Sequence, residues 1–253
     1  MKAIILAAGK GQRLRPLTND RPKCMVKYKD RPIIDYLFDL FGKCGINKIS
    51  VITGYQSEKL IQHLDDKTPT FHLNKNFNTT NMVESLFCAE SEMDEDIIIS
   101  YSDIIYNEKV LTSLMASEAS ISVVIDKNWL KLWETRMDNP LDDVESMILN
   151  EDKTIKELGK KPEGLSQIQG QYIGLIKIKK DFLPKLKTFY KKLDRNVLYD
   201  KKTFENMYMT SFIQLIINKL NPVNAIMIDG GWLEIDTLDD LKAYESSSID
   251  FLS

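Results

Sequence analysis

The chain opens with an uninterrupted apolar segment at residues 3–6, which runs directly into a loop that contains Gly9 and Gly11. The segment has no polar residue to turn toward water, so it is typical of a strand that is buried on both faces of a parallel sheet. Parallel strands need crossover connections, which are usually helices packed on the faces of the sheet. The segment therefore favours an α/β fold with a ligand loop after its first strand.

Strands and helices are predicted in alternation through residues 1–126. Apolar residues recur at helical spacing over residues 32–44, and this helix is expected to end near Gly45. The segments that follow are predicted as strands at 48–53, 70–73, 96–101 and 120–126 and as helices at 57–64, 81–89 and 108–116. This alternating order predicts a mostly parallel central sheet that is flanked by helices.

The pattern changes after residue 127, although no linker divides the chain. We predict short strand-like pieces, one long strand, two helices, two more strands and a last helix, at residues 146–149, 154–158, 169–178, 180–193, 204–220, 225–228, 233–235 and 238–244. Residues 246–248 are expected to be frayed. We interpret residues 1–253 as a single domain, in which residues 1–126 form the core and residues 127–253 an elaboration.

The loop after the first strand has the composition of an anion-binding turn. Ala7 and Ala8 are small and let a ligand approach the backbone, while Gly9 and Gly11 allow positive φ angles. Successive N–H groups in such a turn form a concave site for phosphate oxygens. The sequence thus predicts a phosphate site at this strand end.

Two cations close behind the loop, Arg13 and Lys23, would supply charge-assisted contacts to phosphate. The loop is not the P-loop of ATPases, because no Gly-Lys-Ser/Thr ends it, and Leu14 stands where the dinucleotide fingerprint has its third glycine. The alternative is an ordinary turn with surface cations. The ordered residues behind the loop favour phosphate binding; they are Arg13, Pro16, Thr18, Pro22 and Lys23.

Charge and composition restrict the partners of this site. A net charge of −3 disfavours broad binding to nucleic acid or to a membrane surface, so the N-terminal cations are interpreted as a local site. No apolar run approaches ~20 residues and no signal peptide is recognised, so we expect a cytoplasmic protein. Three cysteines without CxxC spacing support neither a zinc site nor a disulfide framework.

Residues 6–26 resemble the signature of the nucleotidyltransferases that join a nucleoside triphosphate to a sugar phosphate or to a phosphorylated amino alcohol. The resemblance implies a Rossmann-like α/β fold, a requirement for Mg²⁺ and the release of pyrophosphate. It implies that Arg13 stabilises the reacting α-phosphate and that Lys23 also contacts phosphate, both as catalytic residues. It further implies a nucleotide-binding role for Leu6, Ala7, Ala8, Gly9 and Gly11.

Two aspartates at strand ends are candidate metal ligands. Ligands of open α/β sheets bind beyond the carboxyl ends of the strands, and Asp103 and Asp236 each follow a predicted strand. A hard dication on a triphosphate needs one or two carboxylates, and both positions match the metal-binding aspartates of the resembled family. The alternative for each is a carboxylate that stabilises a helix N-terminus.

The nucleobase site is assigned to two other segments. Gly54 and Tyr55 lie at a strand end, where a base would pack. Asn81 and Ser85 are four residues apart and would share one face of a helix. The pattern Asn-x-x-x-Ser-Leu resembles the cytidylyltransferase branch of the family and favours CTP. The alternative is that Asn81 only caps the helix and that Ser85 only packs.

The acceptor site is expected in the second half of the chain. Four segments resemble cytidylyltransferases that act on phosphocholine, 2-aminoethylphosphonate and related amine phosphates: residues 126–133, 157–162, 170–175 and 232–237. In the sugar enzymes a Glu-Lys-Pro places its lysine on the acceptor phosphate. Here Lys160 replaces the glutamate, which argues against a sugar, and Lys161 keeps the phosphate role as a third catalytic residue. The acceptor-binding candidates are Trp129, Trp133, Arg136 and Tyr172.

Several interpretations of these candidates stay open in the sequence. Trp129 and Trp133 would either hold an ammonium group by cation–π contact or form an ordinary amphipathic helix face. Arg136 would pair with a carboxylate or phosphate of the acceptor. Three acidic residues would pair with an amine or form a solvated turn; they are Asp142, Asp143 and Glu145.

The expected partners are therefore CTP and a small phosphorylated acceptor. The whole-chain resemblance favours phosphoglutamine, in capsule phosphoramidate synthesis, because an amino acid would give Arg136 a carboxylate partner and the acidic residues an amine. The alternatives are 2-aminoethylphosphonate or phosphocholine, a sugar 1-phosphate with UTP or dTTP, and a catalytically silent nucleotide sensor. The sequence does not indicate the oligomeric state.

Overall fold

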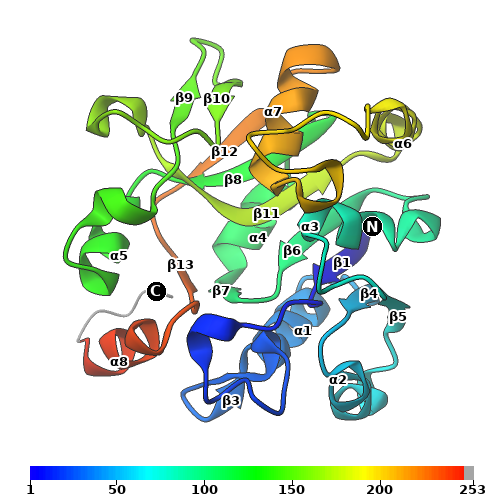
Figure 1. Cartoon of the computed structure of the whole chain (residues 1–253), viewed down its shortest axis with the longest axis vertical. Helices are drawn as coiled ribbons and strands as arrows, with labels where there is room; N and C mark the ends of the chain where they lie inside the picture. Colours follow the sequence, from blue (N-terminus) through cyan, green and yellow to red (C-terminus); the bar gives the residue numbers. More distant parts are fainter. Residues whose placement is uncertain (248–253) are drawn as a thin grey trace.

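A computed structural model describes residues 1–247, and its centre is one seven-stranded sheet (Figure 1). β11 runs antiparallel to both of its neighbours, and every other neighbouring pair is parallel. The predicted mostly parallel sheet is confirmed. The order across the sheet is β12-β8-β11-β6-β1-β4-β5, with bounds Asn224–Ile228, Ile121–Asp126, Gln171–Ile178, Ile97–Tyr101, Lys2–Leu6, Lys48–Thr53 and Thr70–Leu73.

The first strand, β1, lies inside the sheet between β6 and β4. Its alternate side chains enter two separate clusters of buried residues, Ala3 and Ile5 in one and Ile4 and Leu6 in the other. Both faces of the strand are thus covered, which is why the segment carries no polar residue.

Helices cover both faces of the sheet, as the alternating pattern predicts. One cluster of buried residues includes side chains of α1, α2, α4, α5 and α8, and the other includes those of α3, α6 and α7. The predicted helices 180–193 and 204–220 each begin with a separate 3₁₀ turn, at Lys180–Phe182 and Phe204–Asn206. The bounds from α1 to α8 are Ile33–Lys43, Ser57–His63, Met82–Phe87, Glu108–Met115, Trp129–Arg136, Leu183–Lys192, Met209–Lys219 and Leu238–Ser246.

Three two-stranded ribbons complete the described structure. The strand predicted at 233–235 is β13 (Trp232–Glu234), and it pairs with β7 (Ile104–Tyr106), which the sequence pattern does not predict. β9 (Met147–Leu149) pairs with β10 (Ile155–Leu158), and both were predicted as short strands. The unpredicted ribbon of β2 (Lys27–Tyr28) and β3 (Arg31–Pro32) lies behind the phosphate loop.

Residues beyond 126 contribute directly to the central sheet. β11 lies between β6 and β8, and β12 extends the sheet beyond β8. Ser246 ends α8, so it is helical where fraying was expected, and Ser248 lies outside the described residues. Among residues 1–247 no helix combines the length and the apolar character that crossing a bilayer requires.

Candidate active site

The predicted phosphate loop leaves β1 at the carboxyl edge of the sheet. Gly11 has a φ of 59°, the left-handed region that suits glycine, and the hydroxyl of Thr18 donates to its carbonyl oxygen at 2.8 Å. A Cβ on Gly11 would lie 2.9 Å from the Cβ of Lys23. The glycine therefore lets the loop pack directly against the lysine that the sequence assigns to phosphate.

Gly11→Ala is expected to lower the free energy of unfolding by about 1–2 kcal/mol, because alanine is strained at this backbone angle, and to reduce turnover by displacing Lys23. Gly42→Ala is the matched control: its Cβ would meet no atom within 4 Å in the helix α1, so it should leave stability unchanged or raise it by up to about 1 kcal/mol. Denaturant unfolding and initial rates measure both effects. Equal stability of the two variants would contradict the packing argument.

Lys23 lies between the two aspartates that the sequence assigns to a metal. Its Nζ is 2.5 Å from Asp103 Oδ2 and 2.5 Å from Asp236 Oδ1, and all three side chains are at least 86% buried (13%, 14% and 10% exposed). Burial opposes the charge of Lys23, but the two carboxylates outweigh it and raise the pKa of Lys23 above its ordinary value. The lysine is thus a fixed cation at the predicted phosphate site.

The pairing of β7 with β13 brings the two aspartates together from distant parts of the sequence. Asp103 directly precedes β7, and Asp236 follows β13 by two residues. Glu234 stands opposite Ile104 in the ribbon, and the N–H of Ile235 donates to the carbonyl of Asp103 at 2.9 Å. The ribbon register therefore fixes the separation of the two carboxylates.

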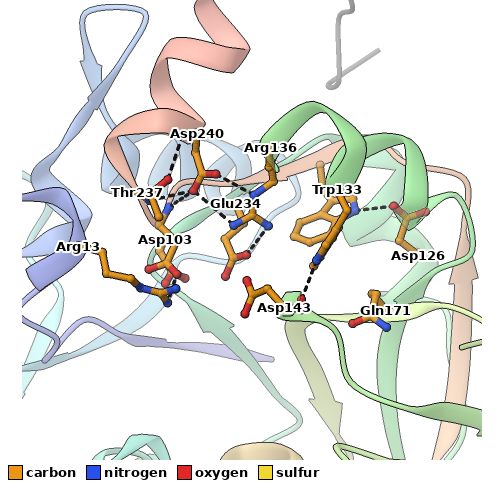
Figure 2. A network of polar contacts seen from close by, with 12 residues as sticks. Arg13, Asp103, Asp126, Trp133, Arg136, Asp143, Gln171, Glu234, Thr237 and Asp240 are labelled. Carbon is orange, nitrogen blue, oxygen red and sulfur yellow. Dashed lines mark hydrogen bonds and ion pairs between the residues drawn. The ribbon is translucent and has the colours of Figure 1, made fainter. Parts of the chain in front are cut away.

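Arg13 reaches the same group from the loop. Its guanidinium forms an ion pair with Asp236, although the side chain as a whole is 63% exposed. Figure 2 shows Arg13 at one end of the polar network, with Glu234 between it and Arg136. Arg13, Lys23, Asp103 and Asp236, which the sequence proposes as catalytic and metal-binding residues, therefore meet at one place.

The two aspartates fit a dication as the sequence expects. Asp103 Oδ1 is buried and has no hydrogen-bond partner among the described residues, so the carboxylate has an unused acceptor. Across residues 1–247 no group of three or more His, Cys, Asp or Glu side chains is arranged around a common point. Two carboxylates with the remaining positions left to phosphate and water suit Mg²⁺, which keeps several waters.

A cavity of about 140 Å³ lies beside this group at the carboxyl edge of β1 and β6. It is lined by five of the predicted nucleotide-binding residues, namely Leu6, Ala8, Gly9, Asn81 and Ser85, and also by Lys23 and Asp103. The side chain of Asn81 accepts from the N–H of Met82 at 2.8 Å, so it caps α3 while it lines the cavity. The capping and ligand-binding interpretations are therefore compatible.

The remaining nucleotide-binding candidates support the cavity without lining it. Ala7 is buried and its N–H donates to Ile52. A Cβ on Gly54 would lie 2.7 Å from the Cβ of Phe77, so the glycine lets that aromatic ring approach the loop. Tyr55 donates its hydroxyl to the carbonyl of Asn19 at 2.7 Å. None of these three candidates lines the cavity.

A second cavity of about 490 Å³ adjoins the first, and Asn81, Met82 and Tyr101 line both. Three residues that the sequence assigns to the acceptor lie in its wall: Trp133, Lys161 and Tyr172. Trp129 does not line it, because its ring is buried edge-on against Trp133 at 5.9 Å. For Trp129 the structure thus shows the ordinary helix face that the sequence left open.

Arg136 is placed behind this cavity instead of in it. Its side chain is 1% exposed and is paired with Asp240 at 2.9 Å and with Glu234 at 2.8 Å. Its guanidinium also stacks on Trp133, 5.0 Å from the ring centroid, and therefore occupies one face of that ring. The structure gives Arg136 carboxylate partners within the protein, where the sequence suggested a carboxylate of the acceptor (Figure 2).

Sequence reasoning missed several residues of the two cavities. Phe77 and Thr80 line the smaller one; they follow β5, and the rule that ligands bind beyond strand ends could have found them. Glu234 lines the larger one; it lies two residues before Asp236, where strand periodicity places side chains on one face. Gln171 is buried in the same wall, and its position beside Tyr172 was the available signal.

Comparison with known proteins supports the family resemblance that the sequence pattern indicates. Residues 2–129 match the family model of nucleotidyl transferases. The chain is 46% identical over 249 residues to the CTP:phosphoglutamine cytidylyltransferase of Campylobacter jejuni, with 96% of this chain and 98% of that protein covered.

Solved structures share the fold at low identity. The CTP:phosphocholine cytidylyltransferase of Streptococcus pneumoniae superposes with a TM-score of 0.72 at 21% identity, covering 96% of this chain and 97% of that one. The inositol-1-phosphate CTP transferase of T. maritima gives a TM-score of 0.71 at 23% identity, covering 96% and 93%. The shared fold therefore covers nearly the whole chain.

Proposed function

The chain belongs to the nucleotidyl transferase family, and from this premise we propose that it transfers CMP from CTP to phosphoglutamine with release of pyrophosphate. The observation that carries the proposal is the identity with the C. jejuni enzyme, because it spans the acceptor half of the chain as well as the nucleotide half. The expectations of a cytoplasmic enzyme and of a role in capsule phosphoramidate synthesis belong to this proposal.

The geometry supports transfer between two adjacent ligands. The smaller cavity adjoins the phosphate loop and would hold CTP, and the larger one would hold the acceptor, with Lys161 on its phosphoryl group. The acceptor oxygen is already anionic near neutral pH, so no general base is required. Arg13 and Lys23 would neutralise the triphosphate, and positioning together with charge stabilisation would supply the catalysis.

Asp103 and Asp236 would hold the Mg²⁺ that the family resemblance implies. When bound, the cation would withdraw charge from the triphosphate oxygens. The chain's own contribution is to hold the two carboxylates in place through the β7–β13 ribbon, with Lys23 balancing their charge.

Asp103→Asn is expected to weaken binding of Mn²⁺, used as a spectroscopic substitute for Mg²⁺, by at least about 10-fold in the presence of a non-hydrolysable CTP analogue. The loss of one anionic ligand is its cause. Electron paramagnetic resonance of free Mn²⁺ measures the effect without turnover. Asp30→Asn, at an exposed turn, is the control, and unchanged Mn²⁺ affinity in the Asp103 variant would exclude this carboxylate as a ligand.

The substrate assignment is tested by pairing each of CTP, UTP, dTTP and ATP with phosphoglutamine, phosphocholine, 2-aminoethylphosphonate and glucose 1-phosphate. Pyrophosphate release is followed, and CTP with phosphoglutamine is expected to give the highest kcat/KM. A preference for glucose 1-phosphate with UTP or dTTP would overturn the cytidylyltransferase proposal. A preference for another amine phosphate would overturn only the acceptor, and no release with any pair would indicate a nucleotide sensor.

A further inference from the structure

Glu145 is a carboxylate in the wall of the larger cavity that has no cationic partner. Its Oε1 accepts a hydrogen bond from the hydroxyl of Thr210 at 3.2 Å, and Thr210 lines the same cavity. Within residues 1–247 no lysine, arginine or histidine nitrogen forms an ion pair with it, and the charged groups that act on it are the carboxylates Asp143 and Asp200. The carboxylate therefore stands in the wall with only a neutral donor beside it.

The backbone of Glu145 is held in place by one buried side chain. Gln171, on β11, accepts from the N–H of Glu145 at 3.3 Å and donates to its carbonyl at 2.7 Å. Gln171 is 5% exposed, so its amide is itself fixed by the packing of the central sheet. Glu145 is thus anchored to the central sheet before any ligand arrives.

Burying the charged form of a carboxylate is energetically unfavourable unless a cation pairs with it. Burial raises the pKa of Glu145 above its ordinary value, since the charged form loses water without gaining a cation. The two lysines of the cavity do not supply one: Lys160 is paired with Glu157 at 2.5 Å, and Lys161 has the position assigned to the acceptor phosphoryl group. A cation carried by the acceptor would pair with the negative charge of Glu145.

Glu145 differs in this respect from the two other acidic residues of the segment. Asp142 and Asp143 also line the cavity, but both residues are exposed, and Asp142 accepts from the side-chain amide of Asn139 at 2.8 Å. Water solvates carboxylates at such positions, so they have little need of a counter-ion. The acidic turn suggested by the sequence therefore divides into a solvated pair and one inward carboxylate.

We propose that Glu145 is the specificity-determining residue that receives the ammonium group of the acceptor. This deepens the proposed function and rests on it. The cavity then selects acceptors that carry a phosphoryl group for Lys161 at one end and an ammonium group for Glu145 at the other. A phosphoryl acceptor without a cation would leave the Glu145 carboxylate uncompensated.

The test compares phosphoglutamine with its deaminated analogue, N-phosphorylglutaramate, which lacks only the ammonium group. The wild-type enzyme is expected to prefer phosphoglutamine by about 10- to 100-fold in kcat/KM, the range of a hydrogen bond between charged groups. In Glu145→Gln the KM for phosphoglutamine should rise, the preference should fall below about threefold, and the KM for CTP should stay within twofold. A merely structural role would weaken both acceptors equally and leave the preference unchanged.

Three further variants make the outcome unambiguous. Glu151→Gln, at an exposed turn, should behave as wild type, while Glu145→Asp should keep part of the preference if the Gln variant fails to fold. Loss of the preference in Asp143→Asn but not in Glu145→Gln would overturn the assignment, as would a wild-type enzyme that does not distinguish the two acceptors. Turnover of neither acceptor, with another used instead, would identify a failure of the proposed function itself.

Discussion

Lys23→Ala is expected to lower kcat by about 10²- to 10³-fold, the loss that follows removal of a single preorganised charge-stabilising group. The lysine contacts both aspartates at 2.5 Å and lines the nucleotide cavity. Its removal therefore withdraws a cation from the triphosphate and leaves two buried carboxylates facing each other, which opposes the approach of a further anion. Pyrophosphate release at saturating CTP and acceptor measures the loss.

Lys27→Ala provides the comparison, because Lys27 is an exposed lysine of the neighbouring ribbon strand β2. The control should keep the rate of the wild type, since an exposed side chain on this strand has no contact with the two aspartates. Circular dichroism shows whether each variant is folded. A Lys23→Ala enzyme that keeps more than a tenth of the wild-type kcat would show that Arg13 and the metal are sufficient for the triphosphate.

The central layer was predictable because its strands are buried on both faces. Strand β1 is the clearest example. Its four consecutive apolar residues are divided between two buried clusters, and such a segment is typical of a strand that is covered on both faces. Turn residues such as Gly45 then mark where helices end. Local patterns of this kind locate elements to within a few residues without any knowledge of partners.

The pairing of strands that lie far apart in the sequence could not be predicted in the same way. β7 and β13 are three-residue strands, and nothing in Ile104–Tyr106 indicates that Trp232–Glu234 lies opposite. The antiparallel insertion of β11 between β6 and β8 is equally invisible, because strand periodicity fixes which face a residue occupies but not its neighbour. The convergence of Asp103 and Asp236 therefore rested on the family resemblance, and the ribbon now supplies its physical reason.

The larger cavity shows most clearly what the sequence pattern cannot predict. Helical spacing places Trp129, Trp133 and Arg136 along one region of α5, but it does not tell which of them faces the cavity. That depends on α8, whose Asp240 takes the guanidinium, and a carboxylate in a helix cap gives no sign of a partner on another helix. The sequence pattern predicted that Arg136 faces the acceptor, and the structure places it behind the cavity wall, paired within the protein.

Asp240→Asn is expected to lower the free energy of unfolding by about 3 kcal/mol, because it removes one of the two anionic partners of a buried guanidinium. Asp240 is 2% exposed and also anchors the backbone beside it, since its Oδ2 accepts from the N–H groups of Asp236 and Thr237, at 2.8 Å each. An amide in its place cannot satisfy these donors and Arg136 with the same charge. We therefore also expect kcat to fall at least about 10-fold, because Asp236 loses the anchor of its backbone.

Asp239→Asn is the matched control on the same turn of α8, because its pair with Lys242 is solvent-exposed (79% and 75% exposed side chains) and should contribute less than about 1 kcal/mol. Urea unfolding measures the stability of both variants. The single variant Arg136→Met and the double variant Arg136→Met/Asp240→Asn are unfolded in the same way, which completes a double-mutant cycle for Arg136 and Asp240. The double variant should be less destabilised than the sum of the two single ones, since it removes the charges of Arg136 and Asp240 together. Additive losses would show that the two residues act independently and would contradict the coupling of Arg136 to Asp240.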